Sequence, residues 1–245
     1  MKPCVAIAIY DHGHTIAGVV DSIASLGLPC LIVDDGSSKP TRDEIDRLAA
    51  DHSWIEIARH PRNLGRGSAL RTAYRNSARR GMTHVVQIDA DGQHDAADIP
   101  KFLDAAKREP GALILGKPLF DASIPRSRLY GRQLSRAIAW IETLSMTVDD
   151  PLCGLRCIPL EPALRVLSRH STGNRMDFDP EFVIRLVRAG VPVINIPTRV
   201  HYPKDGLSHF HMVHDNLRLA RAYLRLALEL PFRRSSDPNP RQDPS

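Results

Sequence analysis

The sequence predicts an α/β protein in which one Rossmann-like, mostly parallel sheet is flanked by helices. Short apolar runs alternate with stretches of helical periodicity along most of the chain, as in strand–helix–strand units. These runs are apolar throughout, which is typical of strands covered on both faces. A chain of 245 residues, 42% of them hydrophobic and 25% charged, can form a single globular domain of this kind.

The pattern places six strands and the helices between them. Apolar runs predict strands at Val5–Ile9, Cys30–Val33, Trp54–Arg59, Val85–Ile88, Ala112–Gly116 and, at the margin of the sheet, Pro192–Pro197. Apolar residues at helical spacing predict helices over Ile16–Ala24, Leu70–Ser77, Ala97–Lys107, Ser127 to about Met146, Phe182–Val187 and Asn216–Leu230. Thr41 and Glu44 predict a capping box for a short helix that ends near Ala50. Residues 200–211 are expected to form a loop, and residues 233–245 a disordered tail.

Composition narrows the possible partners and compartment. The net charge of +5 favours anionic partners such as nucleotides or phospholipid surfaces. Aromatic residues make up only 5% of the chain, so we expect no nucleic-acid partner. The spacing of Cys153 and Cys157 fits neither a zinc knuckle nor a redox motif, and we expect reduced, buried cysteines in a cytoplasmic protein. No apolar run is long enough to cross a bilayer, and the N-terminus leads directly into a strand, so we expect no signal peptide.

The stretch Val85–His94 joins a buried strand to two carboxylates. In an extended chain Asp89 and Asp91 would point to the same side. Two charges about 5 Å apart repel by roughly 3 kcal/mol at an effective dielectric constant near 20, and a divalent cation would remove that repulsion. Carboxylates that leave positions open to phosphate oxygens are typical of Mg²⁺ or Mn²⁺ sites. The alternative is an acidic, solvated turn.

Other polar segments are expected at the same edge of the sheet, because ligands of parallel sheets bind beyond the carboxyl ends of the strands. Tyr10–Asp11 follows the first strand, and Asp34–Asp35 follows the second. These acids could bind a base or a ribose, or they could bond only to backbone amides of their own turn. In the glycine-rich segment Asn63–Gly67, Arg66 suits contact with a diphosphate, although surface loops also need glycines.

Four segments in this order, Ile9–His12, Val33–Ser37, Asn63–Gly67 and Gln87–His94, resemble motifs of the family 2 inverting glycosyltransferases, which have the GT-A fold. The similarity runs from about Val5 to about Tyr223 and is greatest to polyprenyl-phosphate sugar synthases such as dolichyl-phosphate mannose synthase. It implies a nucleotide-sugar site at Tyr10, Asp11, Asp35, Arg66, Asp89 and Ala90, with Asp35 contacting the base, and a metal site at Asp89, Asp91 and Gln93.

Two positions depart from the family pattern. Asp11 and His12 stand where the family usually has Asn-Glu, and Arg66 stands where it usually has Lys. The arginine keeps the positive charge of the lysine, but it replaces a compact ammonium group with a planar guanidinium group.

The second half of the chain is expected to bind the acceptor. The resemblance implies that Arg128, Arg132 and Ser135 hold an acceptor phosphate. At helical spacing they share one face, which could equally be a solvated basic surface.

Three acids, Asp177, Asp179 and Glu181, lie at the start of the helix over Phe182–Val187. Acids there favour the helix dipole, which explains them without catalysis. The resemblance implies instead that one of them is a general base for an acceptor hydroxyl; Asp179 matches best, with Asp177 and Glu181 as alternatives. An acceptor phosphate is already an anion and would need no base.

The helix over Asn216–Leu230 is amphipathic. Its arginine stripe comprises Arg218, Arg221 and Arg225, and the opposite face carries Leu217, Leu224 and Leu228. This helix could pack on the domain, or it could lie on an anionic membrane surface with its apolar side down and its arginines among the headgroups. The lipid-linked acceptors common in the family favour the membrane.

These features predict a metal-dependent glycosyltransferase that moves a sugar, with inversion, from a nucleotide-diphospho-sugar to a lipid-linked or polyprenyl-phosphate acceptor. Residues 1–118 would bind the donor and residues 119–232 the acceptor. We expect a cytoplasmic enzyme, peripheral to the inner face of the membrane. Two alternatives remain: Asp89–Asp91 also resembles the nucleophile motif of haloacid-dehalogenase-type phosphatases, and a protein with this fold could bind membranes without catalysis.

Overall fold

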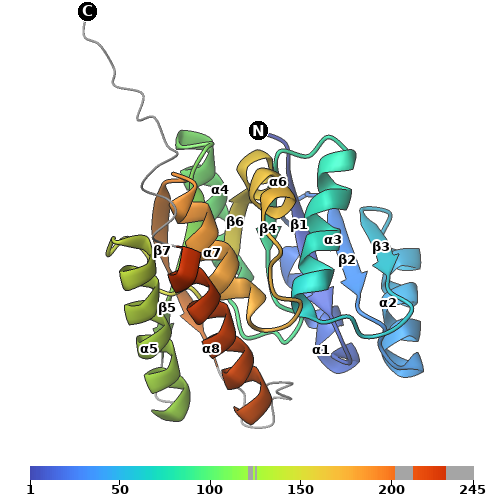
Figure 1. Ribbon diagram of the computed structural model, residues 1–245. Helices are drawn as coiled ribbons and strands as arrows, with labels where there is room; N and C mark the ends of the chain where they lie inside the picture. The colour runs from blue at the N-terminus through green and yellow to red at the C-terminus, as the bar shows by residue number, and fades with distance from the viewer. Residues whose placement is uncertain (121–123, 125, 202–211, 230–245) are drawn as a thin grey trace, which may run out of the picture.

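Within the described residues, seven strands form one sheet in the order β3-β2-β1-β4-β6-β5-β7 (Figure 1). The computed structural model describes residues 1–120, 124, 126–201 and 212–229, without the side chains of 126–128, 212 and 213. The expected tail over 233–245 and most of the expected loop over 200–211 therefore lie outside the described residues.

The strands are β1 (Pro3–Ile9), β2 (Cys30–Asp34), β3 (Ile55–Arg59), β4 (His84–Gln87), β5 (Leu113–Phe120), β6 (Arg156–Pro159) and β7 (Val193–Val200). The α-helices are α1 (Gly13–Ala24), α2 (Lys39–Asp51), α3 (Arg66–Arg79), α4 (Ile99–Arg108), α5 (Arg126–Thr143), α6 (Leu160–Arg169), α7 (Phe178–Arg188) and α8 (Met212–Glu229). A short 3₁₀ helix, η1 (Ala96–Asp98), precedes α4. None of the helices in these ranges is long and apolar enough to span a membrane.

The sheet is mostly parallel, as predicted. Only β6 runs antiparallel to its neighbours β4 and β5 among the described strands, whereas the remaining neighbours pair in parallel. The expected marginal strand is β7, at the edge of the sheet. The sequence did not predict β6 or α6.

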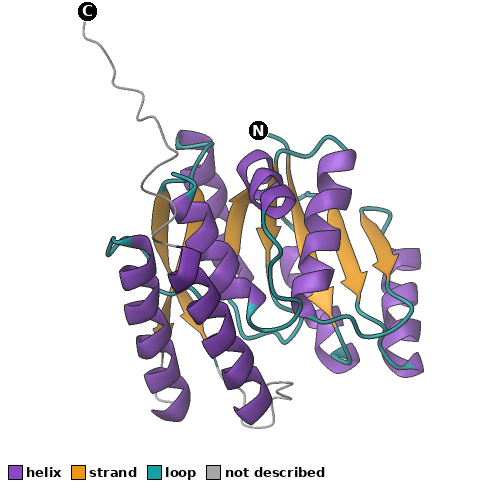
Figure 2. Ribbon diagram, in the orientation of Figure 1, coloured by secondary structure: helices purple, strands orange, loops and turns teal. Residues whose placement is uncertain are grey.

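Helices cover both faces of the sheet (Figure 2). Cys4 and Ala6 of β1 belong to one core, together with residues of α3, α5, α6, α7 and α8. Val5 and Ile7 belong to a second core with α1, α2 and α4. Because alternate residues of one strand enter different cores, the strand must be apolar at every position, which explains the continuous apolar runs.

The capping box predicted at Thr41 is wrong. Helix α2 begins at Lys39, and Thr41 lies within its first turn. The Thr41 side chain is buried, and its hydroxyl oxygen accepts a hydrogen bond from the backbone N–H of Gly13 at 3.2 Å. Thr41 therefore joins α2 to the start of α1, and this tertiary contact takes the place of the local cap.

The prediction for the cysteines is confirmed as far as the structure reports them. All four are buried and none forms a disulfide. Burial raises the pKa of the Cys153 and Cys157 thiols to about 12, so both stay protonated and unreactive at neutral pH.

Candidate active site

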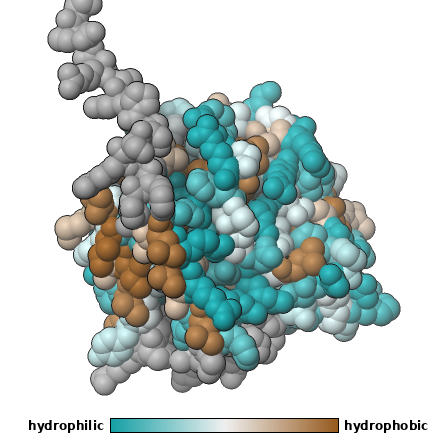
Figure 3. All heavy atoms as spheres, in the orientation of Figure 1, coloured by the Kyte–Doolittle hydropathy of each residue, from teal (hydrophilic) through white to brown (hydrophobic). Residues whose placement is uncertain are grey.

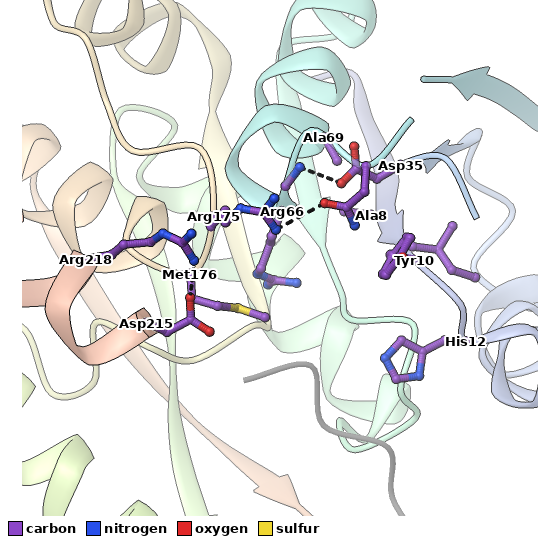
Figure 4. Close-up of a pocket in the computed structure, with 13 residues that line it drawn as sticks. Ala8, Tyr10, His12, Asp35, Arg66, Ala69, Arg175, Met176, Asp215 and Arg218 are labelled. Atoms are coloured by element: carbon purple, nitrogen blue, oxygen red, sulfur yellow. Dashed lines mark hydrogen bonds and ion pairs between the residues drawn. The ribbon is translucent and has the colours of Figure 1, made fainter. Parts of the chain in front are cut away.

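A cavity of about 360 Å³ lies beyond the carboxyl ends of β1 and β2. Its walls come from both halves of the chain: Ala8, Ile9, Tyr10, His12, Asp35, Asn63, Gly65, Arg66 and Ala69 from the first, and Arg175, Met176, Asp215 and Arg218 from the second. Figure 4 shows Tyr10 and His12 on one side, Asp215 and Arg218 on the other, and Arg66 between them. The cavity is therefore at the edge that the polar strand ends predicted.

Asp35 fixes the segment that leads into α3. Its buried carboxylate accepts hydrogen bonds from the backbone N–H groups of Leu64 at 3.0 Å and Gly65 at 2.7 Å, and it lies 2.7 Å from Nδ1 of His60. Gly65 has φ +99°, and a Cβ there would come within 2.4 Å of the carbonyl oxygen of Asn174. A glycine is therefore required at the point where Asp35 positions Arg66. The base contact predicted for Asp35 stays a prediction.

Arg66 joins an acid from each half of the chain. Its Nη2 donates to Oδ1 of Asp89 at 2.6 Å, and its Nε donates to Oδ2 of Asp179 at 2.7 Å. Burial alone would lower the pKa of Arg66, but the charges of Asp179 and Asp89 raise it well above its usual value. Burial alone would raise the pKa of Asp89, but the charge of Arg66, its hydrogen bond and further neighbouring charges together lower it. Arg66 is thus a permanent cation between two carboxylates.

A second arginine completes this network. Nη2 of Arg156 lies 3.1 Å from Oδ1 of Asp179, an ion pair without hydrogen-bond geometry. The Arg156 side chain is fully buried, and it also donates to the carbonyl oxygens of Cys153 and Pro151. Each oxygen of Asp179 therefore faces a guanidinium group.

Gly154, in the loop that leads into β6, and His94, after β4, lie next to the Asp89 carboxylate. A Cβ at Gly154 would lie 2.0 Å from Oδ2 of Asp89, so only glycine leaves room for this carboxylate. Nε2 of His94 lies 3.8 Å from the same oxygen. Burial lowers the pKa of His94 to about 4, which keeps the imidazole neutral at physiological pH. The sequence placed His94 in the motif without giving it a role.

Asp91 does not follow strand geometry, which corrects the argument from alternating side chains. Strand β4 ends at Gln87, and a turn follows in which Gly92 has φ +71°. The Asp91 carboxylate accepts the N–H of Gln93 at 3.0 Å. The carbonyl oxygen of Gln93 accepts the N–H of His201 at 3.0 Å. The ligand roles predicted for Asp91 and Gln93 stay predictions.

A divalent cation fits this site only if a bound ligand supplies part of its coordination shell. Within the described ranges, no three His, Cys, Asp or Glu side chains are grouped closely enough to hold a metal ion by themselves. Arg66 bonds to Oδ1 of Asp89, which leaves Oδ2 outside that hydrogen bond. Hard carboxylate oxygens with the remaining positions taken by phosphate oxygens and water suit Mg²⁺ or Mn²⁺.

Two other predicted donor-site residues shape the loops beside the cavity. Asp11, with φ +53°, accepts hydrogen bonds from the backbone N–H and the hydroxyl of Ser38. Ala90 is buried, and its carbonyl oxygen accepts the hydroxyl of Thr15 at 2.6 Å. Of the first-half residues predicted to bind the donor, Tyr10, Asp35 and Arg66 line the cavity itself.

Arg132 and Ser135, two of the acceptor residues predicted on α5, do not line the cavity. Arg132 pairs with Asp150 at 2.5 Å and lies over the ring of Phe120. Ser135 is buried. Arg132 and Ser135 therefore do not form the solvated basic face that was the alternative. The side chain of Arg128 lies outside the described residues.

The three acids near α7 have different surroundings. Asp177 precedes the helix and accepts the N–H of Arg175, but its side chain does not cap α7. Glu181 is fully buried and accepts hydrogen bonds from Arg185, Arg225 and the N–H of Gly173. Only Asp179 of the three is tied to Asp89 through Arg66.

Sequence reasoning missed the second-half wall of the cavity. Arg218 pairs with Asp215 at 2.8 Å, and both line the cavity. The sequence signalled Arg218 as part of a basic stripe but assigned that stripe to headgroups. Arg175, whose Nη1 donates to Asn63 at 3.2 Å, lies in a segment where only the acids had drawn attention.

A family model described as glycosyl transferase family 2 matches residues 4–147. The polyprenol monophosphomannose synthase of Mycolicibacterium smegmatis is 36% identical over 214 residues, which cover 84% of this chain and 80% of that protein. The chain belongs to glycosyl transferase family 2. Family membership assigns the chain to the glycosyltransferases and removes the haloacid-dehalogenase-type phosphatase as an alternative.

Two further comparisons agree with this family. Glycosyltransferase AglJ of Haloferax volcanii is 26% identical over 208 residues; the match covers 83% of this chain but only 64% of the length of AglJ. The glucosyl-3-phosphoglycerate synthase of Mycobacterium tuberculosis, solved with Mn²⁺, UDP-glucose and glycerol 3-phosphate, has a TM-score of 0.61 at 19% identity, over 98% of this chain and 82% of that one. The predicted GT-A fold is thereby confirmed.

Proposed function

We propose that this family 2 glycosyltransferase moves a sugar from a nucleotide-diphospho-sugar to a polyprenyl phosphate, with a divalent cation and with inversion at the anomeric carbon. The observation that carries the proposal is the cavity wall, in which Arg66, Arg175 and Arg218 gather at the carboxyl edge of the sheet. Three guanidinium groups in one cavity suit ligands that carry several phosphate charges.

The donor would lie across the first-half wall. Tyr10 and Asp35 line the part of the cavity reached from β1 and β2, which suits a nucleoside, and Arg66 suits the diphosphate. Asp89 and Asp91 would hold Mg²⁺ or Mn²⁺ jointly with the diphosphate, with Gln93 as the third predicted ligand. When bound, the cation would neutralise the negative charge that develops on the departing diphosphate. The solved relative with Mn²⁺ and UDP-glucose supports this choice.

The acceptor is proposed to be a phosphate because of the surroundings of Asp179. A general base needs an oxygen that faces the acceptor hydroxyl, yet both oxygens of Asp179 face arginines. A phosphate oxygen is already anionic and can attack the anomeric carbon directly; the new bond forms opposite the bond to the diphosphate, which breaks and carries away the electron pair. In this reaction Asp179 positions Arg66. The relative named polyprenol monophosphomannose synthase supports a phosphate acceptor of this kind.

The proposal keeps the division of the chain into a donor part over residues 1–118 and an acceptor part over 119–232, with Arg128, Arg132 and Ser135 as candidate acceptor residues and Asp177 and Glu181 as alternatives to Asp179. A lipid-linked acceptor would place the enzyme at the cytoplasmic face of a membrane.

The test measures transfer of labelled sugar from UDP- and GDP-sugars to a short-chain polyprenyl phosphate in the presence of Mn²⁺. We expect Asp91→Asn to lower turnover by about a thousandfold, corresponding to about 4 kcal/mol of transition-state stabilisation, while thermal unfolding is unchanged. The control is Asp95→Asn, an exposed neighbour that caps η1 and for which Asn is an equally good cap.

Two outcomes would contradict the proposal. Full turnover in the presence of EDTA would remove the cation from the mechanism. Transfer to alcohols but not to polyprenyl phosphates would remove the phosphate acceptor and restore the need for a base. Independently of these outcomes, a thermal-shift series with different nucleotide-sugars, with and without Mn²⁺, would identify the donor, because the bound donor raises the melting temperature.

A further inference from the structure

Helices α5 and α8 expose a continuous set of large apolar side chains. On α5 and the turn after it these are Tyr130, Leu134, Ile141, Leu144 and Met146, and on α8 they are Leu217, Leu224 and Leu228, all between 53% and 80% exposed. On each helix they recur at the three- and four-residue spacing of a single face. Figure 3 shows apolar side chains gathered over these two helices. We name these eight residues the α5–α8 face.

The charges of the two helices leave this face without exposed acids. Glu142 of α5 is buried against Arg188, and Asp215 of α8 is buried against Arg218. Glu229 pairs with Arg185 of α7. Among the described exposed residues of α5 and α8, the charged one is Arg221, which lies between Leu217 and Leu224 on the same face. The α5–α8 face is therefore apolar and cationic.

This arrangement corrects the roles expected for two arginines of α8. For a helix lying on a membrane, the arginine stripe was predicted to reach headgroups, but Arg218 lines the cavity and Arg225 bonds to buried Glu181. The three leucines are exposed, as that orientation requires. Leu217 and Arg218 are adjacent in α8. The same helix therefore contributes one side to the α5–α8 face and another side to the wall of the cavity.

We propose that the α5–α8 face docks on an anionic lipid bilayer, which brings the phosphate of a membrane-embedded acceptor to the cavity beside Arg218. The proposal rests on the function proposed above and identifies the surface through which the acceptor arrives. Eight exposed apolar side chains around an arginine fit a bilayer surface, where leucines enter the acyl region and Arg221 meets anionic headgroups. A second copy fits less well, because a two-fold contact would bury Arg221 against a face whose described residues carry no exposed acid to pair with it.

The experiment is flotation of the full chain with vesicles of phosphatidylglycerol and phosphatidylcholine, compared with phosphatidylcholine alone. We expect Leu217→Ser, Leu224→Ser and Leu228→Ser together to weaken binding on the order of a hundredfold, since each removes a side chain from the acyl region. Arg221→Glu is expected to weaken binding to the anionic vesicles about tenfold. Arg42→Glu is the matched control, because it makes the same charge change at an exposed position of α2, at the other edge of the sheet (Figure 1).

A second readout separates this proposal from the proposed function. Transfer to a water-soluble short-chain polyprenyl phosphate should be unchanged in the serine variant, whereas transfer to a long-chain polyprenyl phosphate in vesicles should fall with binding. An enzyme that uses the soluble acceptor but does not float with anionic vesicles would overturn the docking proposal alone. Flotation without transfer to any polyprenyl phosphate would overturn the proposed function alone.

Two further outcomes also overturn docking on lipid. One is vesicle binding that the serine variant retains in full. The other is a dimer in light scattering that the serine variant dissociates, with no binding to vesicles, because the α5–α8 face would then be an interface between copies of the chain.

Discussion

The two halves of the molecule use their arginines differently. In the first half, Arg66 extends from the start of α3 to the edge of the sheet and contacts acids of the candidate site. In the second half, Arg132, Arg185 and Arg188 each bind an acid of that same half, in pairs that are largely buried. Arg66 presents its charge to a ligand, whereas Arg185 and Arg188 fasten α7 to α8 and α5 through Glu229 and Glu142.

The difference shows that a basic helix does not imply a basic surface. Arg218 and Arg225 of α8 pair with Asp215 and Glu181, and the outer face of the helix carries leucines and Arg221. The net charge of +5 therefore says little about which surface is positive.

The sharpest test of the fastening role compares two Glu–Arg pairs at the same helical spacing. Glu181 and Arg185 are almost fully buried, whereas Glu161 and Arg165 are exposed. We expect Glu181→Ala to lower the free energy of unfolding by about 3–5 kcal/mol, because Arg185 and Arg225 lose a buried partner. Glu161→Ala should change it by about 0.5 kcal/mol or less. Denaturant unfolding measures both, and equal losses would refute the fastening role of the buried pair.

Arg66→Lys tests the arginine that pairs with an acid of each half, Asp89 and Asp179. A lysine carries a single ammonium group and cannot bond to Asp89 and Asp179 as the guanidinium does. We expect turnover to fall by about tenfold to a hundredfold, as is typical when a charged hydrogen bond in a site is lost. Arg59→Lys is the control, because Arg59 also bridges two acids, Asp34 and Asp46, but does not line the cavity. Equal kinetics of the two variants would show that bridging as such has no catalytic role.

His84 gives a smaller, pH-dependent test within the first half. It lies at the amino end of β4, buried, between the hydroxyl of Thr83 and the carbonyl oxygen of Pro110. Burial lowers the pKa of His84, so below the unfolded value of about 6.5 the unfolded chain binds more protons. The contribution of His84 to stability is therefore lost as the pH falls from there toward its folded pKa.

His84→Gln should flatten the pH dependence of unfolding in that window and leave the pH profile of turnover unchanged, because the site lies at the other end of the strand. A shifted turnover profile would show that the amino end of the sheet also influences the chemistry. Thermal unfolding and initial rates measured over the same pH series make the comparison.

The fold of the first half could be predicted because its strands are buried on both faces. Each such strand is an unbroken apolar run, and the polar turns between β1, β2 and β4 and their following helices are visible in the sequence. Strand β6 could not be predicted, because it has four residues, begins with Arg156 and ends with a proline. Arg156 is fully buried, and the acid that pairs with it, Asp179, comes from a different segment of the chain.

The sequence predicted which segments form the site, but it did not predict how their side chains contact one another. The sequence brought Tyr10, Asp35, Arg66 and Asp89 to one edge of the sheet. It could not show that Asp35 bonds to the backbone of the Arg66 segment, because that contact spans about thirty residues of chain. The orientation of α8 was not predictable either, because the helix buries other apolar residues such as Leu226, and because the acid that pairs with Arg225, Glu181, lies in another helix.

The reversed direction of β6 has a consequence for the centre of the site. Arg156, where β6 begins, pairs with Gln87, where β4 ends. At this point one segment leaves the sheet and another arrives, so that Gly154 of the arriving segment rests against Asp89 of the departing one. A residue inserted or removed just before β6 would therefore disturb the Asp89 carboxylate directly, while the registers of β1, β2 and β3 stayed intact.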